Sequence, residues 1–297
     1  MDWHHPEHWL TGLLHPSPTI ILLTTCVVLF LPIFLHHFIF RSTTSTNLPS
    51  FLLIGPKGAG KTALLTLFER GTPAATHTSQ TPLSVEVSLS VNATASSKYR
   101  SDNDPALLVH KKFLLVDTPG HGKLRHHALD SIVQPQHLKG IIFVVDAASL
   151  SSGGSSSKAD EGLREAAEYL HDVLLLLQQR ASSSKASRAP VEMPVLIAAN
   201  KLDLFTALPA PLVKTALEAE ITRVRSSRAK GLLDSGIGMG DADVEEEKEW
   251  LGDGGEGKFD FSQMEEVNVS VQVVGGNVTG AEGPDVANWW EWIGHHL

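Results

Sequence analysis

The sequence of 297 residues contains a single cysteine, Cys26, and therefore cannot form an internal disulfide. A chain without disulfides suits a reducing compartment, which indicates a cytosolic setting for its folded part. Basic residues are also few, because 24 Lys and Arg stand against 33 Asp and Glu, for a formal charge of −9. This acidic balance argues against nucleic acid as a direct partner.

Residues 19–40 contain no Asp, Glu, Lys or Arg. An uncharged helix of this length, at ~1.5 Å per residue, crosses a ~30 Å hydrocarbon core, and Pro32 would kink it without forbidding it. The first 18 residues hold no Lys or Arg, so the basic region of a cleavable signal peptide is missing. We predict a transmembrane helix, and Arg41 directly after it places the C-terminal side in the cytoplasm.

A phosphate-binding loop follows the short apolar run at 51–54. Its residues are Gly55-Pro56-Lys57-Gly58-Ala59-Gly60-Lys61-Thr62. Glycines let such a loop wrap around a phosphate chain, with backbone N–H groups and a helix N-terminus facing the anion. Lys61 then neutralises the β- and γ-phosphates and the Thr62 hydroxyl ligates Mg²⁺. The alternative is a Gly- and Lys-rich turn that holds no ligand, and two further motifs argue against it.

The first of these motifs ends the apolar run at 113–116 and reads Asp117-Thr118-Pro119-Gly120. In this arrangement Asp117 holds Mg²⁺ through water and the Gly120 amide bonds the γ-phosphate, so the following segment senses that phosphate. His121 stands where many small GTPases carry a water-positioning glutamine. It is either a water-positioning catalytic residue or a surface residue of the switch.

The second motif ends the run at 195–199 and reads Asn200-Lys201-Leu202-Asp203. Asp203 offers two acceptors to the N1–H and amino groups of guanine, a donor pair that adenine lacks, and the Lys201 stem can lie over the ring. The three motifs together predict binding of GTP or GDP with Mg²⁺.

Strand-like and helix-like runs alternate along the chain, which predicts an α/β fold with a doubly wound sheet. Together with the motifs, this indicates a Ras-like P-loop GTPase domain, a mostly parallel six-stranded sheet flanked by helices, preceded by one transmembrane helix. Residues 231–258 are acidic and Gly-rich, and we read them as a disordered insert. The predicted organisation is a tail at 1–18, a span at 19–40, a linker at 41–50 and a GTPase domain at 51–297.

The anchor, the three motifs, the run Lys258-Phe259-Asp260-Phe261 and the terminal Trp-x-Glu-Trp-Ile resemble the signal recognition particle receptor beta-subunit family, in its fungal form. The resemblance runs over nearly the whole chain. It implies a GTPase of the endoplasmic reticulum membrane that, when bound to GTP, recruits the N-terminal domain of the receptor's alpha subunit. Signal recognition particle, ribosome and translocon are then indirect partners. Candidates for the apolar surface that such a partner would bury are Leu83, Val85 and the segment after Gly120, and each of them could instead be sheet or helix core.

Two parts of the site stay open in the sequence. The switch threonine that completes Mg²⁺ coordination comes from residues 76–81, and we favour Thr78, with Thr81 second. The fifth GTPase motif falls after 271–274, where Gly275-Gly276-Asn277 replaces the usual Ser-Ala-Lys. We expect backbone amides there, beginning with Gly275, to contact the guanine oxygen.

Two other functions compete with a docking GTPase. A membrane-bound nucleoside-phosphate kinase would use the same loop, but its arginine-rich lid is missing and Asp203 would be unexplained. An Arf-like trafficking GTPase normally carries a lipidated glycine after the initiator Met, and here Asp2 follows Met1.

Overall fold

The structure is a computed structural model that describes residues 18–42, 48–90, 110–133, 137–151, 157–183, 192–234, 251–252, 257–281 and 283–297. It divides into two units, Met1–Asn47 and Leu48–Leu297. The predicted N-terminal tail lies outside the described residues except for its last residue, Pro18.

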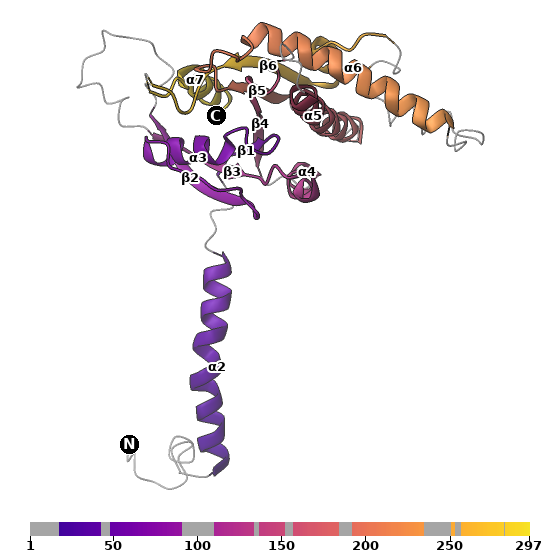
Figure 1. Cartoon of the computed structure of the whole chain (residues 1–297). Helices are drawn as coiled ribbons and strands as arrows, with labels where there is room; N and C mark the ends of the chain where they lie inside the picture. Colours follow the sequence, from indigo (N-terminus) through magenta and orange to yellow (C-terminus); the bar gives the residue numbers. More distant parts are fainter. Residues whose placement is uncertain are drawn as a thin grey trace. The chain divides into compact units, whose positions relative to one another are not determined.

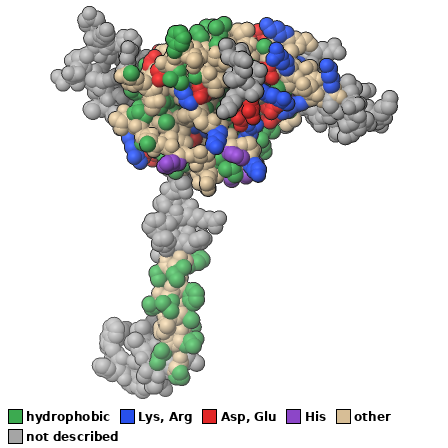
Figure 2. All heavy atoms as spheres, in the orientation of Figure 1, with side chains coloured by type: hydrophobic (Ala, Val, Ile, Leu, Met, Phe, Trp, Pro, Cys, Tyr) green, Lys and Arg blue, Asp and Glu red, His purple; other side chains and the backbone are tan. Residues whose placement is uncertain are grey.

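The described residues of the first unit form the helix α2 (Pro18–Ser42), which runs through Pro32 without a break. Its large apolar side chains between Ile21 and Phe34 are exposed, and Figure 2 shows them in green around the helix. In the part of the chain that the structure describes, no helix is both long and apolar enough to cross a membrane, so the predicted span is not confirmed.

The second unit is built on a six-stranded sheet in the order β2-β3-β1-β4-β5-β6 (Figure 1). The strands are β1 (Ser50–Ile54), β2 (Leu83–Ser90), β3 (His110–Asp117), β4 (Leu138–Asp146), β5 (Met193–Asn200) and β6 (Val269–Gly275). Only β2 and β3 pair antiparallel, and the other neighbours are parallel. The sheet is therefore mixed, and the predicted six-stranded α/β architecture is confirmed.

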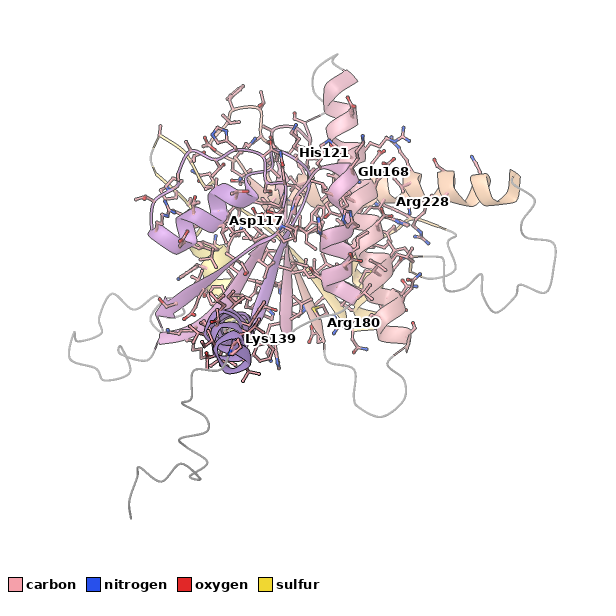
Figure 3. The ribbon with its side chains drawn as sticks, turned by 90° about the horizontal axis from the view of Figure 1, so that it is seen from below. Asp117, His121, Lys139, Glu168, Arg180 and Arg228 are labelled. Carbon is pink, nitrogen blue, oxygen red and sulfur yellow. The ribbon has the colours of Figure 1, made fainter. Side chains whose placement is uncertain are left out.

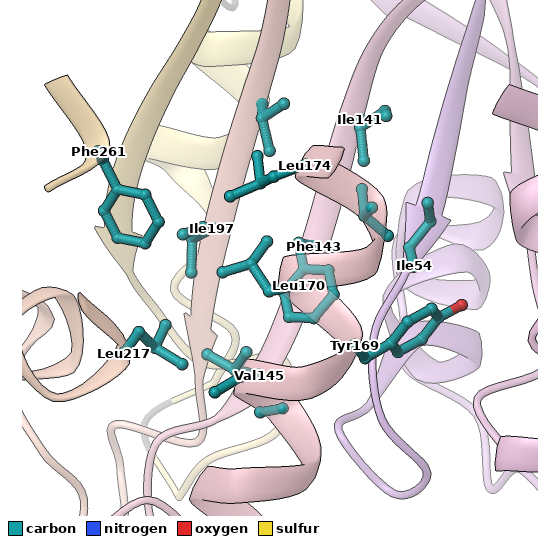
Figure 4. Close-up of a cluster of buried hydrophobic side chains, with 14 of the residues drawn as sticks. Ile54, Ile141, Phe143, Val145, Tyr169, Leu170, Leu174, Ile197, Leu217 and Phe261 are labelled. Carbon is teal, nitrogen blue, oxygen red and sulfur yellow. The ribbon is translucent and has the colours of Figure 1, made fainter. Parts of the chain in front are cut away.

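Two layers of helices cover the sheet. The helices are α3 (Lys61–Arg70), α4 (His126–Val133), α5 (Ser157–Ser183), α6 (Ala210–Asp234) and α7 (Ala287–His296), with short 3₁₀ helices η3 (Gly122–Leu124) and η5 (Phe261–Val267). Helices α4, α5 and α6 and the η5 turn share one buried cluster, part of which Figure 4 shows. Helices α3 and α7 share the other.

Strict alternation in the strands produces these two clusters. In β1, Leu52 and Ile54 pack with the α5 side, whereas Phe51 and Leu53 pack with the α3 side. Successive strand residues point to opposite faces, so a sheet covered on both faces is apolar at every position. All five residues of β1 are buried. Trp289 of α7 is fully buried in the second cluster, as core packing predicts.

The predicted insert at 231–258 is described only near its ends, and these are ordered parts of the domain. Helix α6 continues to Asp234, and Leu251 is fully buried in the α5-side cluster. The Gly252 backbone N–H donates to Gln178 Oε1 of α5 at 2.9 Å. These described residues of the predicted range are therefore ordered, because α6 continues into it and Leu251 packs in the core. The remaining residues of the range lie outside the described part of the chain.

Candidate functional site

The three motifs meet at one edge of the sheet, because parallel strands end at the same edge. Leu53 of β1 pairs with Asp117 of β3, and Asp146 of β4 pairs with Asn200 of β5. In Figure 3, Asp117 lies at the end of its strand and His121 lies beyond it. The loops after β1, β3 and β5 therefore surround one place.

Two glycines of the phosphate loop are required by its geometry. Gly55 has φ +144°, and a Cβ there would lie 2.1 Å from the Val144 carbonyl oxygen. Gly60 has φ +100°, and its Cβ would lie 2.3 Å from Asn200 Nδ2. Both positions combine a left-handed backbone with close approach, which only glycine accommodates.

The Lys61 side chain reaches back to the start of the phosphate loop. Its Nζ donates to the carbonyl oxygens of Gly55 at 2.8 Å and Pro56 at 2.9 Å, and the residue is only 5% exposed. Burial lowers the pKa of Lys61 from its ordinary 10.5 to about 8, against the opposing effect of Asp117. A cation buried at this cost suits an anionic ligand, because a phosphate would stabilise its charged form.

We expect the Lys61 charge to make the nucleotide-free protein less stable at neutral than at alkaline pH. Below about pH 8 the amine is charged in the folded and unfolded states, and burial penalises the folded one by about 3 kcal/mol. Between pH 8 and 10.5 the unfolded state binds more protons, so the free energy of unfolding rises with pH.

Urea unfolding of the nucleotide-free full chain at pH 7.5 and 9.5 measures this contribution against Lys61→Met. The difference in unfolding free energy between the two proteins should change by about 2 kcal/mol in favour of wild type at the higher pH. Parallel pH dependences in the two proteins would contradict the assignment.

Asp117 and Thr62 together have the chemistry of a divalent-cation site. The Thr62 hydroxyl donates to Asp117 Oδ2 at 2.6 Å, and Asp117 is fully buried. Within the described residues, Asp117 Oδ1 is buried without a hydrogen-bond partner. Burial raises the pKa of Asp117, while Thr62 and then Lys61 oppose that rise. A hard cation such as Mg²⁺ prefers carboxylate and hydroxyl oxygens, so these residues fit it.

Gly120 brings the next segment against the phosphate loop. A Cβ at Gly120 would lie 2.4 Å from Lys61 Nζ and 2.6 Å from the Gly55 carbonyl oxygen. The adjacent His121 is exposed, and its Nδ1 accepts a hydrogen bond from the Lys123 backbone N–H at 3.2 Å, which caps η3. The His121 ring therefore already has a local structural partner.

The Asn200 side chain hydrogen-bonds to three loops of the candidate site. Its Nδ2 donates to the Ala59 carbonyl oxygen at 2.7 Å, and its Oδ1 accepts from the backbone N–H groups of Lys201 at 2.8 Å and Val278 at 3.1 Å. The side chain is buried. Asn200 thus ties the phosphate loop, its own loop and the loop after β6 together.

Asp146 is a site residue that sequence reasoning missed. Lys201 Nζ donates to Asp146 Oδ2 at 2.5 Å, while Asp146 Oδ1 accepts from the backbone N–H groups of Ala148 and Ser149. The pair fixes the Lys201 stem at the strand edge. A carboxylate directly after the apolar run at 140–145 was the available signal, since strand ends on this edge carry the other site residues.

The fifth-motif region lies beside the loop that carries Asp203, and the expected contact of its backbone amides with guanine stays a prediction. Gly275 is the last residue of β6 and lies against Leu202, whose Cδ1 would be 2.3 Å from an added Cβ. The exposed Asp203 instead has Gly280 beside it, with 3.3 Å between the Asp203 Cβ and an added Gly280 Cβ. The loop facing Asp203 therefore lies a few residues beyond Gly275.

The two candidate switch threonines are not brought to the site. Thr78 and Thr81 are exposed in the irregular stretch between α3 and β2. Among the residues that the structure describes, neither of them hydrogen-bonds to Thr62 or Asp117. The choice between them stays a prediction.

Comparison with known proteins agrees with this geometry. The family model described as signal recognition particle receptor beta subunit matches residues 46–269. The signal recognition particle receptor subunit beta of Saccharomyces cerevisiae is 30% identical over 250 residues, covering 84% of this chain and 84% of the relative.

Solved structures from Chaetomium thermophilum are also similar. One, described as the SRb-GTP/SRX complex of the signal recognition particle receptor, has a TM-score of 0.68 and 42% identity, covering 84% of this chain and 100% of that chain. Another, described as SRb-GDP-Mg, has a TM-score of 0.61 and 43% identity, covering 86% and 100%. On this evidence the chain belongs to the signal recognition particle receptor beta subunit family.

Proposed function

We propose that this chain binds GTP and GDP with Mg²⁺ and acts as a nucleotide-dependent docking module. The observation that carries the proposal is the buried Asp117 carboxylate beside the buried Lys61 ammonium. Thr62 donates to one oxygen of this carboxylate, and the other oxygen has no hydrogen-bond partner among the described residues. Relatives with 42% and 43% identity are described with GTP, and with GDP and Mg, respectively.

The roles of the residues follow from their positions. We assign the phosphates to residues 55–62, with Thr62 and Asp117 holding Mg²⁺, Asp117 through water, and Thr78 or Thr81 completing that site. When bound, Mg²⁺ supplies positive charge against the phosphates. Asn200, Lys201 and Asp203 hold guanine, together with backbone amides of residues 275–280. His121 is the candidate for positioning water, and we expect slow hydrolysis without a partner.

The partner that we propose is the alpha subunit of the receptor, through its N-terminal domain. A relative is described in complex with SRX, and the family is that of the receptor's beta subunit. Gly120 links the segment after β3 to the phosphate loop, so the ligand state can alter the surface offered to a partner. Signal recognition particle, ribosome and translocon would follow as indirect partners.

We also propose that residues 19–40 anchor the chain in the endoplasmic reticulum membrane, with the domain from residue 51 in the cytosol. The uncharged run and the exposed apolar side chains of α2 support this. In water such a surface would be unfavourable, whereas lipid tails would cover it.

A pull-down from solubilised membranes tests the docking function directly. With full-length chain as bait, GTP should retain the alpha subunit and GDP should release most of it, as mass spectrometry of the bound proteins would show. Equal capture in GTP, GDP and no nucleotide would contradict nucleotide-dependent docking. Alkaline extraction of the same membranes should leave the chain in the pellet, and its release would contradict the anchor.

A further inference from the structure

Hydrogen bonds to β1 hold the first residue of the segment from Thr118 to Arg125. The backbone N–H and the hydroxyl of Thr118 both donate to the Leu53 carbonyl oxygen, at 3.2 and 2.7 Å. Gly120 then lies against Lys61, as described above. The near end of the segment is therefore fixed by β1 and by the phosphate loop.

Arg125 fastens the far end of the same segment. Its Nη2 donates to Glu165 Oε1 of α5 at 2.8 Å, and its guanidinium carbon lies 4.4 Å from the centroid of the Tyr169 ring. The Arg125 carbonyl oxygen accepts from the backbone N–H groups of Ala128 and Leu129, which begins α4. The Arg125 side chain is 18% exposed and the Glu165 side chain 42%, so solvent partly screens the ion pair, while the contact with the buried Tyr169 ring is shielded.

Arg125 packs against a residue of α5 that is itself held in the core. Glu165 and Tyr169 are four residues apart on α5 and therefore share one face of the helix. Tyr169 is fully buried, with its ring edge-on to Phe143 of β4 at 5.7 Å. Burial raises the pKa of Tyr169, while Arg125 and then the Thr118 side chain oppose the rise. Tyr169 therefore packs against Arg125 at the far end of the segment, and its hydroxyl has no hydrogen-bond partner among the described residues.

The Arg125–Glu165 pair also lies within electrostatic reach of Lys61. After burial and Asp117, Glu165 raises and Arg125 lowers the pKa of Lys61. While Arg125 and Glu165 are paired, their opposite charges have opposing electrostatic effects at the phosphate loop. Without Arg125, the Glu165 carboxylate would add negative charge near the place where we put the phosphates, which disfavours the more highly charged ligand.

We propose that Arg125, seated between Glu165 and Tyr169, is a positioning residue that holds residues 118–125 with Gly120 against the phosphate loop and so favours the nucleoside triphosphate over the diphosphate. The nucleotide preference rests on the proposed function. The placement of the segment does not.

Hydrogen–deuterium exchange of the purified full chain tests the placement. Arg125→Ala and the milder Glu165→Gln should each speed exchange of the amides at 119–127 about tenfold, because a charge-assisted bond that holds the segment is lost. Exchange in β4 and β5 should not change. Arg164→Ala is the matched control, because it removes an exposed ion pair with Glu168 on the same helix. It should leave 119–127 unchanged.

The affinity ratio for GTPγS and GDP tests the coupling. Arg125→Ala should weaken GTPγS binding about tenfold and GDP binding much less. Glu165→Gln should lower the same affinity ratio by a smaller factor, because the Arg125 charge that it leaves unpaired attracts the phosphates. Arg164→Ala should leave the ratio unchanged. Unaltered exchange at 119–127, or faster exchange spread evenly over the whole domain, would overturn the proposal. An unchanged ratio would overturn the coupling. A wild-type chain that binds neither nucleotide would instead overturn the proposed function, while the exchange contrast still decides the placement.

Discussion

Replacing Lys61 with alanine should weaken binding of GTP and GDP at least about a hundredfold, because a buried ammonium-to-phosphate contact is lost. Capture of the alpha subunit should disappear with it. The variant should still fold, since the buried charge of Lys61 itself opposes folding at neutral pH. Fluorescent-nucleotide titration and the membrane pull-down measure the two effects, and a thermal melt checks the fold.

Lys57→Ala is the matched control for this experiment. Lys57 belongs to the same loop and carries the same charge, but it is exposed, whereas Lys61 is buried. Its replacement should change nucleotide affinity by less than about threefold, because exposed charges are screened by solvent. Retained partner capture by Lys61→Ala, with nucleotide binding lost, would show that docking does not depend on nucleotide.

Replacing Asp203 with asparagine should change the preferred base of the bound nucleotide from guanine to xanthine. The amide offers a donor where the carboxylate offered an acceptor, so one bond to guanine becomes a clash of two donors. Xanthine carries a carbonyl at the position of the guanine amino group and accepts that donor. GTP affinity should fall at least about a hundredfold, and xanthosine triphosphate should become the tighter ligand.

Asp130→Asn makes the same chemical change at another exposed position, on α4. Competition of each triphosphate against labelled GDP should show no change in preference for this control. Asp203→Asn that keeps its GTP affinity would reject the base assignment. An equal loss of affinity for both triphosphates would indicate that the substitution damages the loop. Faster hydrogen–deuterium exchange of the backbone amides of Lys201 and Val278, which donate to the Asn200 side chain, would reveal such damage.

Local sequence patterns predicted the sheet and the positions of the motifs, because each motif directly follows an apolar run. Runs at 51–54, 113–116 and 195–199 correspond to β1, β3 and β5, with small shifts at their ends. Parallel strands bring their carboxyl ends to one edge, so the meeting of Lys61, Asp117 and Asn200 follows from the fold class.

Contacts between residues distant in sequence were not predictable in the same way. Asp146 holds Lys201 across 55 positions, and Arg125 holds Glu165 across 40. No spacing rule connects such pairs, since only the packed sheet and helices bring them together. In the sequence Arg125 cannot be told from a surface arginine, because its contacts with Glu165 and Tyr169 depend on the packing of α5 beside it.

The region after α6 shows a different limit. Its acidic, glycine-rich composition indicated disorder, but composition averages over a window and hides a single anchoring residue. Leu251, inside the predicted range 231–258, is fully buried. Just beyond that range, Phe259 and Phe261 pack edge-on with ring centroids 5.6 Å apart. The Phe261 backbone N–H donates to the buried Glu218 carboxylate of α6 at 3.2 Å. Tertiary packing therefore orders a stretch that local composition would leave free.

The most direct test of the account is a titration of the purified, detergent-solubilised full chain with labelled GTP and Mg²⁺. The arrangement of Lys61, Asp117 and Asp203 predicts one nucleotide per chain, displaced by GTP or GDP, not by ATP, and bound more weakly after chelation of Mg²⁺. Absence of binding, or displacement by ATP as effective as displacement by GTP, would contradict it.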